Sequence, residues 1–143
     1  MTERSVEHGT ITIERTLAAS LARAFAAWTN PEGWDDAYEQ HEFRVGGRKL
    51  QTFGPPGERI FREDGRYEDI VPNKRIVYTY SIWRGEARIT ASLQTVEFAA
   101  QGARTNMFLT EQIAILDGGD TAADRERGIG MWLDKFEAAL QRS

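Results

Sequence analysis

The fold of this chain is decided by residues 75–98, which read RIVYTYSIWRGEARITASLQTVEF. Two runs of alternating side chains, 75–83 and 87–98, flank the turn residues at 84–86. Alternation with period two in a run rich in Ile, Val, Thr and aromatic residues is typical of a β-strand. The short Gly-containing turn between the two runs therefore predicts an antiparallel hairpin.

Strand-like runs continue on both sides of this hairpin, at 9–17, 38–45, 48–53, 60–71 and 105–112. Gly46-Gly47 predicts a two-residue hairpin turn, because both positions tolerate positive φ. Gly65 interrupts its run and predicts a bulge or sharp bend that curves the sheet. Gly54–Gly57, Pro72-Asn73 and Gln101-Gly102 are predicted turns. Together these segments predict about six or seven strands.

Two helices are predicted, one near each end of the strand region. Ser20 is a suitable N-cap for an amphipathic helix that ends at Asn30-Pro31. Thr121 and Asp124 resemble a capping box that begins a longer helix, which runs to about Gln141. The apolar residues of this helix share one face, which must be buried: Ile129, Trp132, Leu133, Phe136 and Leu140.

The order of elements is strand, helix, many strands, long helix, which favours an α+β fold over a doubly wound parallel sheet. The 143 residues show no internal repeat and no linker, so we expect one domain over 1–143. A net charge of −4 with scattered basic residues argues against a nucleic-acid surface. Residues 1–8 lack the apolar run of a secretory signal, and nowhere are there ~18 consecutive apolar residues. We therefore expect a cytoplasmic protein that does not enter the membrane.

Metal and thiol chemistry find little support in the sequence. The chain has no Cys and two His, of which His8 is near the N-terminus. Neither an HExxH pattern nor a cluster of His and carboxylates at helical spacing is present. The glycines at 128 and 130 do not form a GxGxxG fingerprint and follow no βα unit. We expect neither a metal nor a cofactor.

A resemblance to a known family covers nearly the whole chain. It is carried by Arg44–Gly47, Glu63–Pro72, Arg75–Tyr78, Ser92–Phe98, Gly102–Thr105, Leu109–Gln112, Leu116–Asp120 and the helix Arg125–Leu140. These stretches resemble the START-like, Bet v 1-like (SRPBCC) helix-grip superfamily, and within it the bacterial domains similar to the activator of Hsp90 ATPase homologue. The resemblance implies a curved antiparallel sheet wrapped around a long C-terminal helix, with a largely apolar cavity between them. This chain has Gly128-Ile129 where many relatives have Gly-Trp, and Gln94 where they have an apolar residue. We therefore expect its cavity lining to differ from theirs.

The candidate ligand-binding residues are mostly aromatic: Trp28, Trp34, His41, Phe53, Tyr78, Tyr80, Gln94, Trp132 and Phe136. Core packing explains any one of these aromatic side chains, but as a group they can also line a mostly apolar pocket. Tyr78 and Tyr80 share one face of their strand, and the sequence leaves open which face points inward. Gln94 is in register with Val96 and Phe98, so it is either buried with a partner or lines the cavity.

Three residues are candidates for acid or base chemistry, each with a structural alternative. His41 is the one His in the body of the chain and is either a general base, a ligand contact or a structural residue. Glu63 and Glu68 lie in a charge-rich strand, where cross-strand ion pairing is the alternative.

Gly128 and Gly130 lower the stability of the long helix by roughly 1–2 kcal/mol relative to Ala, which a close approach to the sheet or a bend at the cavity mouth would offset. Met131 indicates such a bend or a homodimer contact.

Three functions remain open from the sequence. The first is binding of a small hydrophobic or aromatic molecule in the cavity without chemistry. The second is an enzyme similar to polyketide cyclases and aromatases, in which His41, a buried Glu or Tyr78 acts as acid or base. The third is an interaction protein similar to the Hsp90 cochaperone, active in a stress response through its outer surface.

Overall fold

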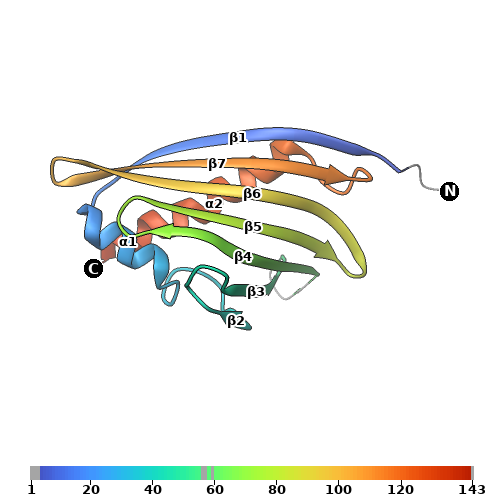
Figure 1. The fold of residues 1–143 in the computed structure, drawn as a ribbon, viewed down its shortest axis with the longest axis horizontal. Helices are drawn as coiled ribbons and strands as arrows, with labels where there is room; N and C mark the ends of the chain where they lie inside the picture. The colour runs from blue at the N-terminus through green and yellow to red at the C-terminus, as the bar shows by residue number, and fades with distance from the viewer. Residues whose placement is uncertain (1–3, 56–57, 59, 143) are drawn as a thin grey trace.

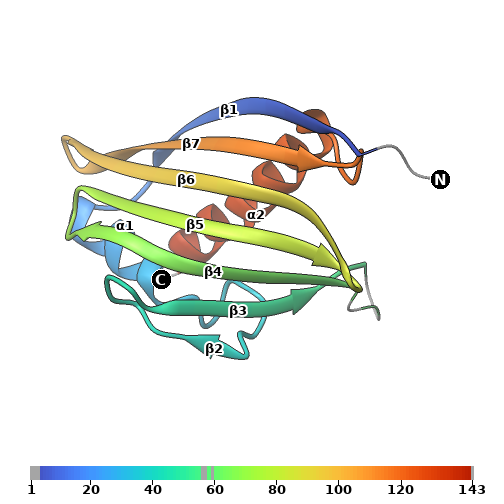
Figure 2. The ribbon, with the colours of Figure 1, turned by 45° about the vertical axis from the view of Figure 1, so that its right-hand side comes forward.

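The computed structural model of the protein describes residues 4–55, 58 and 60–142. The strands in this part of the chain are β1 (Val6–Leu17), β2 (Gln40–His41), β3 (Arg48–Phe53), β4 (Phe61–Val71), β5 (Arg75–Arg84), β6 (Ala87–Gln101) and β7 (Arg104–Leu116). They form an antiparallel sheet in the order β1-β7-β6-β5-β4-β3-β2. The helices are α1 (Leu21–Thr29) and α2 (Ala122–Arg142). The curved sheet lies over α2 (Figure 1), which crosses one face of it diagonally (Figure 2). The predicted α+β helix-grip fold is confirmed.

The hairpin that the sequence placed at residues 75–98 is the pair β5 and β6. Arg84 pairs with Ala87 across a turn in which Gly85 has a φ of 59°. The face of β5 that carries Tyr78, Tyr80 and Ile82 is buried, whereas the alternate residues are half-buried. This observation settles which face of β5 points toward α2.

The predicted strand at 38–45 is wrong in its length, because β2 covers only Gln40–His41. The predicted two-residue turn at Gly46-Gly47 is also too short. The backbone at 46 and 47 hydrogen-bonds with Tyr67 of β4, through Gly46 N to Tyr67 O and Tyr67 N to Gly47 O. The chain therefore leaves β2 early to pair with the middle of β4 instead of continuing the hairpin.

The irregularity in β4 lies two to four residues beyond Gly65, where the prediction had placed it. Gly65 pairs regularly with Tyr80, and the register shifts between Tyr67 and Asp69. Gly65 serves a different purpose, because a Cβ at this position would lie 2.1 Å from the hydroxyl of Tyr78. Of the predicted turn at 54–57, residues 56 and 57 lie outside the described residues.

Both helices begin as predicted. Ser20 Oγ accepts from Arg23 N at 3.3 Å at the start of α1, and Thr121 Oγ1 accepts from Asp124 N at 3.1 Å at the start of α2. The predicted inner face of α2 is confirmed, with Trp132 half-buried and four residues fully buried: Ile129, Leu133, Phe136 and Leu140.

The packed core lies where the C-terminal half of α2 meets α1 and the sheet. The Trp28 ring is 5.0 Å from the rings of both Trp132 and Phe136, and 5.6 Å from that of Trp34. Phe98 of β6 completes this aromatic core at 6.3 Å from Trp28. The N-terminal half of α2 lies over a part of the sheet that is not filled in this way.

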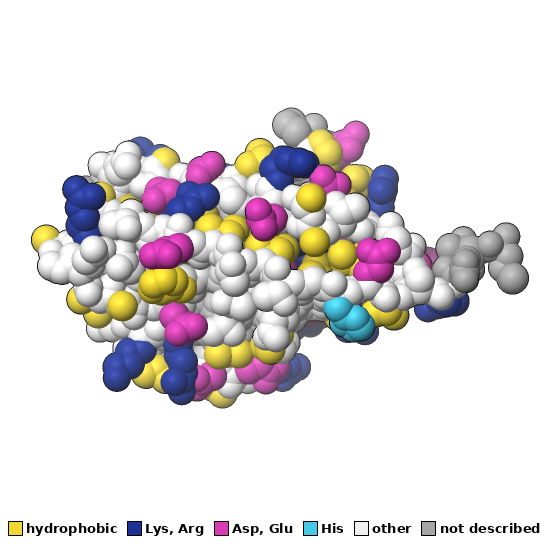
Figure 3. Space-filling view, turned by 90° about the horizontal axis from the view of Figure 1, so that it is seen from above, with side chains coloured by type: hydrophobic (Ala, Val, Ile, Leu, Met, Phe, Trp, Pro, Cys, Tyr) yellow, Lys and Arg dark blue, Asp and Glu magenta, His cyan; other side chains and the backbone are white. Residues whose placement is uncertain are grey.

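Neither α1 nor α2, within the residues described, is long and apolar enough to cross a membrane. On the side of the molecule seen in Figure 3, Lys and Arg side chains lie among Asp and Glu side chains and apolar spots. Among the described residues, no three His, Cys, Asp or Glu side chains are grouped so that they could hold a metal ion.

Candidate functional site

A cavity of about 430 Å³ lies between the sheet and the N-terminal half of α2. Its apolar walls include the stacked rings of Phe53 and Phe61, whose centroids are 5.4 Å apart, and Trp132 of α2. Ile82 and Ile129 close it from the sheet and from the helix. This lining is of the mostly apolar kind that suits a small organic ligand.

Two buried ion pairs lie at the wall of the cavity, which also carries other polar side chains such as Asp36, Asp124 and Lys135. The first, here called the lysine pair, joins Lys49 of β3 to Glu63 of β4, with Nζ 3.1 Å from Oε2. Tyr78 of β5 donates its hydroxyl to the same Oε2 at 2.8 Å. The side chains of Lys49 and Glu63 are 7% and 14% exposed. The absent side chain at Gly65 makes room for the Tyr78 hydroxyl in this arrangement.

Aromatic rings surround the Lys49 ammonium. Nζ lies 4.7 Å from the ring centroid of Tyr38, 5.3 Å from that of Trp132 and 5.5 Å from that of Tyr78. Attraction between a cation and the faces of aromatic rings offsets part of the free energy that burial of the charge costs. Lys49 is therefore a charged group held inside a largely apolar chamber.

The second ion pair, here called the arginine pair, joins Arg125 in the first turn of α2 to Glu111 of β7. Arg125 Nη1 lies 2.9 Å from Glu111 Oε2, and the Glu111 side chain is fully buried. Tyr80 donates its hydroxyl to Glu111 Oε2, and Gln94 Nε2 donates to Oε1 at 3.0 Å. Arg125 Nη2 also donates to Thr90 Oγ1 at 2.8 Å. The arginine pair thus ties α2 to three strands through a satisfied polar network.

The two tyrosines of these networks stay protonated at neutral pH. Burial, followed by the nearby charge of Glu63, raises the pKa of Tyr78 far above its ordinary value. Burial, followed by Glu111, does the same to the pKa of Tyr80. Burial alone would lower the pKa of Arg125, but Tyr80, Glu111 and Asp120 together raise it.

A separate space of about 20 Å³, here called the extension, lies beside the cavity and shares Lys49, Tyr78, Gln94 and Trp132 with its lining. His41 lines it, with Nε2 2.8 Å from the hydroxyl of Tyr67. Burial, followed by the charge of Lys49, lowers the pKa of His41, so the ring is neutral at neutral pH. Trp28 and Trp34 also line this extension.

The structure brings most of the predicted site residues together. Five candidate ligand-binding residues line the main cavity: Phe53, Tyr78, Tyr80, Gln94 and Trp132. Glu63, a catalytic candidate, lines it as well. Phe136 belongs to the aromatic core and lines neither space. Glu68 is exposed on the opposite face of the sheet, where it accepts from Thr79 Oγ1 at 2.6 Å.

Of the four charged residues in the two ion pairs, only Glu63 was a candidate from the sequence; Lys49, Glu111 and Arg125 were not. Glu111 lies between Leu109 and Ile113 on the inward-facing side of β7, so a charge in an apolar alternation was a readable signal. Lys49 alternates with Gln51, and both are inward-facing polar residues. The alternation in β3 does not reveal their orientation, because the apolar Leu50 lies on the other face, which is half-buried.

The two glycines of α2 are not explained by close approach to the sheet. A Cβ at Gly128 would meet nothing within 4 Å, and one at Gly130 would meet only Arg15 Nη2 at 3.7 Å. Gly128 lines the cavity next to Asp124 and the exposed Met131. Its missing side chain therefore leaves the mouth of the cavity wider.

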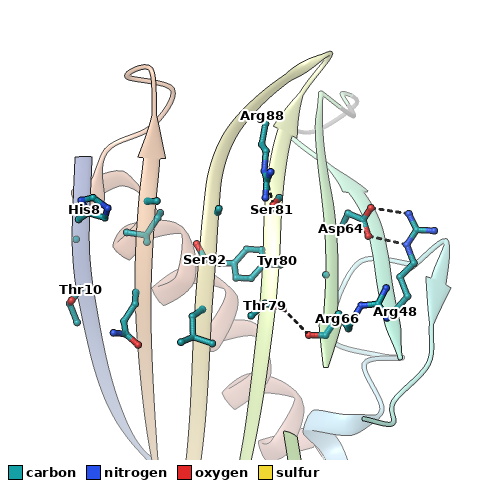
Figure 4. Close-up of a pocket in the computed structure, with 17 residues that line it drawn as sticks. His8, Thr10, Arg48, Asp64, Arg66, Thr79, Tyr80, Ser81, Arg88 and Ser92 are labelled. Carbon is teal, nitrogen blue, oxygen red and sulfur yellow. Dashed lines mark hydrogen bonds and ion pairs between the residues drawn. The ribbon is translucent and has the colours of Figure 1, made fainter. Parts of the chain in front are cut away.

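A second hollow of about 690 Å³ lies on the outer face of the sheet. It spreads over six strands, with α2 behind them (Figure 4). Its best-defined charges, Arg48 and Asp64, pair with each other at 2.8 Å, and side chains such as Thr10 and Ser81 are short and polar. No second layer of the described chain encloses this hollow, so the inner cavity is the better candidate site.

Comparisons with known proteins agree with this architecture. The family model for Activator of Hsp90 ATPase homolog 1-like protein matches residues 18–141. A protein from Rhizobium leguminosarum, described only as uncharacterized, is 39% identical with a TM-score of 0.89, over 99% of this chain and 100% of that chain. The Mll3558 protein from Rhizobium loti is 37% identical with a TM-score of 0.84, over 94% of this chain and 99% of that chain. The search of curated proteins found no match.

More distant structures share the fold alone. Norcoclaurine synthase from Thalictrum flavum, solved as a point mutant with a transition-state analogue, is 12% identical with a TM-score of 0.69. The alignment covers 96% of this chain and 97% of that chain. The resemblance inferred from the sequence is confirmed by the match over residues 18–141, and the chain belongs to the family of activator of Hsp90 ATPase homolog 1-like proteins.

Proposed function

We propose that the protein binds a small, largely apolar molecule with an aromatic ring system and a hydrogen-bonding oxygen in the cavity under α2. The observation that carries this proposal is a space of about 430 Å³ with aromatic walls and a buried ammonium group inside it. A packed core would have filled such a space, because voids of this size lower the free energy of unfolding.

The polar groups explain how such a ligand would be held. A ligand that buries ~200 Å² of apolar area gains ~5 kcal/mol from that burial. Association costs ~4–15 kcal/mol, so apolar walls need help from oriented polar contacts. Lys49 is a donor in the cavity wall, and its ammonium suits an oxygen acceptor on the ligand.

Chemical unfolding with and without ligand tests this function. A neutral probe such as 2-naphthalenemethanol at 100 times its Kd should raise the free energy of unfolding by ~2.7 kcal/mol. Gly128→Leu is the matched control, since it adds a side chain at the mouth where a Cβ meets nothing within 4 Å. Equal stabilisation of both proteins, or none with a panel of neutral aromatic alcohols and ketones, would contradict the proposal.

A second candidate is an enzyme that moves a proton on a bound ligand. It is favoured by the chain of contacts from Lys49 to Glu63 to the Tyr78 hydroxyl, at 3.1 and 2.8 Å, inside the cavity. General acid–base catalysis requires a titratable group within hydrogen-bond reach of the ligand, and the Glu63 carboxylate is the candidate for it. Exchange of the α-protons of a bound ketone with deuterated water, abolished in Glu63→Gln, would support it. A cochaperone-like role and a cytoplasmic location remain predictions from the sequence.

A further inference from the structure

The proposed function concerns binding, and the lysine pair points beyond it to a covalent step. The sequence has 18 Lys and Arg residues, of which only Lys49, Lys74 and Lys135 are Lys. Lys74 lies exposed in the turn after β4, and Lys135 is 50% exposed at the cavity mouth. Lys49 alone of the three is buried, with its Nζ directed at Glu63 inside the cavity.

The two buried cations of the cavity differ in what they can do. A guanidinium keeps its proton under all ordinary conditions, whereas an ammonium can release one and become a nucleophile. Arg125 is fixed by five different side chains and has a raised pKa. Lys49 has one carboxylate partner and three aromatic rings around it. Lys49 is therefore the cation that can react.

From these contacts we infer that Lys49 forms an imine with an apolar aldehyde or ketone bound in the cavity. This inference rests on the proposed binding function and names its ligand class. A carbonyl compound presents an oxygen acceptor to the polar wall and a flat apolar body to Phe53, Phe61 and Trp132. Entry of such a ligand displaces water from the part of the cavity that Lys49 faces.

The groups present account for every atom and proton in the formation of the imine. Glu63 Oε2, 3.1 Å from Lys49 Nζ, takes one ammonium proton, and the free amine forms a C–N bond with the carbonyl carbon. A second nitrogen-bound proton passes to the carbonyl oxygen, which gives a carbinolamine. The proton held by Glu63 then converts this hydroxyl group into water, which leaves. The product is an iminium ion, whose positive charge remains paired with the Glu63 carboxylate, and no oxidant or reductant is consumed.

Tyr78 gives this site a positioning residue. Its hydroxyl donates to Glu63 Oε2 at 2.8 Å, the same oxygen that faces Lys49. The raised pKa of Tyr78 keeps this proton in place at neutral pH. The Glu63 carboxylate is thus held toward Lys49 by a neutral donor, in a geometry that the space over Gly65 permits.

The test is trapping with 2-naphthaldehyde and sodium cyanoborohydride on the full chain, followed by intact-mass measurement and peptide mapping. The expected result is one naphthylmethyl group per chain, on the peptide that contains Lys49. Lys49→Arg, which keeps the charge, should lose this adduct, and Lys74→Arg should keep it. Glu63→Gln should slow the trapping about 100-fold, because it removes the proton acceptor.

The matched alcohol, 2-naphthalenemethanol, separates this inference from the proposed binding function. Stabilisation by the alcohol without a Lys49 adduct from the aldehyde would overturn the inference and leave the binding function in place. Adducts spread over Lys74, Lys135 and the α-amino group according to their exposure would overturn it too. If neither compound binds or reacts, the binding function itself fails.

Discussion

The arginine pair and the lysine pair are built from the same chemical parts but occupy different surroundings. Each joins a cation to a glutamate that also accepts from a tyrosine hydroxyl. In the arginine pair the glutamate is fully buried, and the cation has further partners in Thr90 and Asp120. The two cations are similarly exposed, 7% for Lys49 and 10% for Arg125, but Glu63 of the lysine pair is 14% exposed, whereas Glu111 is fully buried.

The difference shows how one sheet can hold both a structural and a reactive polar group. The arginine pair connects α2 to the far strands and closes its own network, so its value is in fixing the helix over the sheet. The lysine pair faces empty space between Phe53 and Trp132, so its hydrogen-bonding capacity is available to a ligand. Stability should therefore depend more on the first pair, and binding more on the second.

The largest expected effect is the loss of stability in Arg125→Met. This change leaves Glu111 as an uncompensated buried charge, which should lower the free energy of unfolding by about 3–5 kcal/mol. Urea denaturation measures it. The double variant Arg125→Met/Glu111→Gln should recover part of the loss, because the amide carries no charge and its oxygen can still accept from the Tyr80 hydroxyl. A loss below about 1 kcal/mol in the single variant would mean that the pair does not hold α2.

Lys49→Met should cost less, about 1–3 kcal/mol in the free energy of unfolding, because Glu63 keeps the Tyr78 hydroxyl and some solvent. Its main effect should be on ligand binding, seen as reduced stabilisation by 2-naphthalenemethanol. If this variant were as unstable as Arg125→Met, the two pairs would not differ in their contribution to stability. Unchanged stabilisation by the ligand would contradict a role of the lysine pair in binding.

Alkaline titration tests the burial of the phenols that serve both pairs. All four tyrosines have a raised pKa, and in each case burial is the first cause: Tyr38, Tyr67, Tyr78 and Tyr80. In the unfolded chain they ionise near pH 10. Stability is therefore intact below about pH 10 and falls as pH rises above it, by about 1.4 kcal/mol per tyrosine and pH unit.

Near-ultraviolet absorbance of tyrosinate, followed together with circular dichroism, measures this titration. Tyrosinate should appear only as the fold is lost, in one cooperative step. Ionisation of three or more of the four tyrosines near pH 10 in the folded protein would show that at least one of Tyr78 and Tyr80 is not a buried donor in its pair.

The smallest effect is a gain in stability from Gly128→Ala. Alanine in a helix interior is more favourable than glycine by about 0.5–1 kcal/mol, and the added Cβ meets nothing within 4 Å. Thermal or urea unfolding should show this increase. Gly130→Ala is the matched comparison, because it gives the same gain in helix propensity but places the new Cβ 3.7 Å from Arg15 Nη2. A destabilised Gly128→Ala would indicate that this part of α2 packs against something.

Strands and helix faces could be predicted from the sequence because their signals are local. The period-two alternation at residues 75–98 and the apolar face of α2 each follow from a single element. The early end of β2 could not be predicted, since it depends on hydrogen bonds between residues 46–47 and Tyr67, about twenty positions away. The purpose of Gly65 likewise depends on a tyrosine from the neighbouring strand.

The candidate site was predictable mainly in its aromatic part, together with the polar residues Gln94 and Glu63. Tyr78, Phe53 and Trp132 were expected to line a cavity because large apolar side chains on inward faces collect there. Cross-strand ion pairing was expected for Glu63, but on a solvated face. Lys49, Glu111 and Arg125 were missed because each has its partner on another element, and charged residues are by default expected at the surface. Glu111 in an apolar strand was the clearest signal of a buried charge.

The most direct test of the central claim is a titration of ¹⁵N-labelled protein with 2-naphthalenemethanol, followed by amide chemical shifts. We expect saturable shifts around Phe53, Tyr78 and Ile129, where β3, β5 and α2 enclose the inner cavity. Shifts concentrated on the outer hollow around Thr10 and Ala91, or no shifts at any ligand concentration, would contradict a ligand site between the sheet and α2.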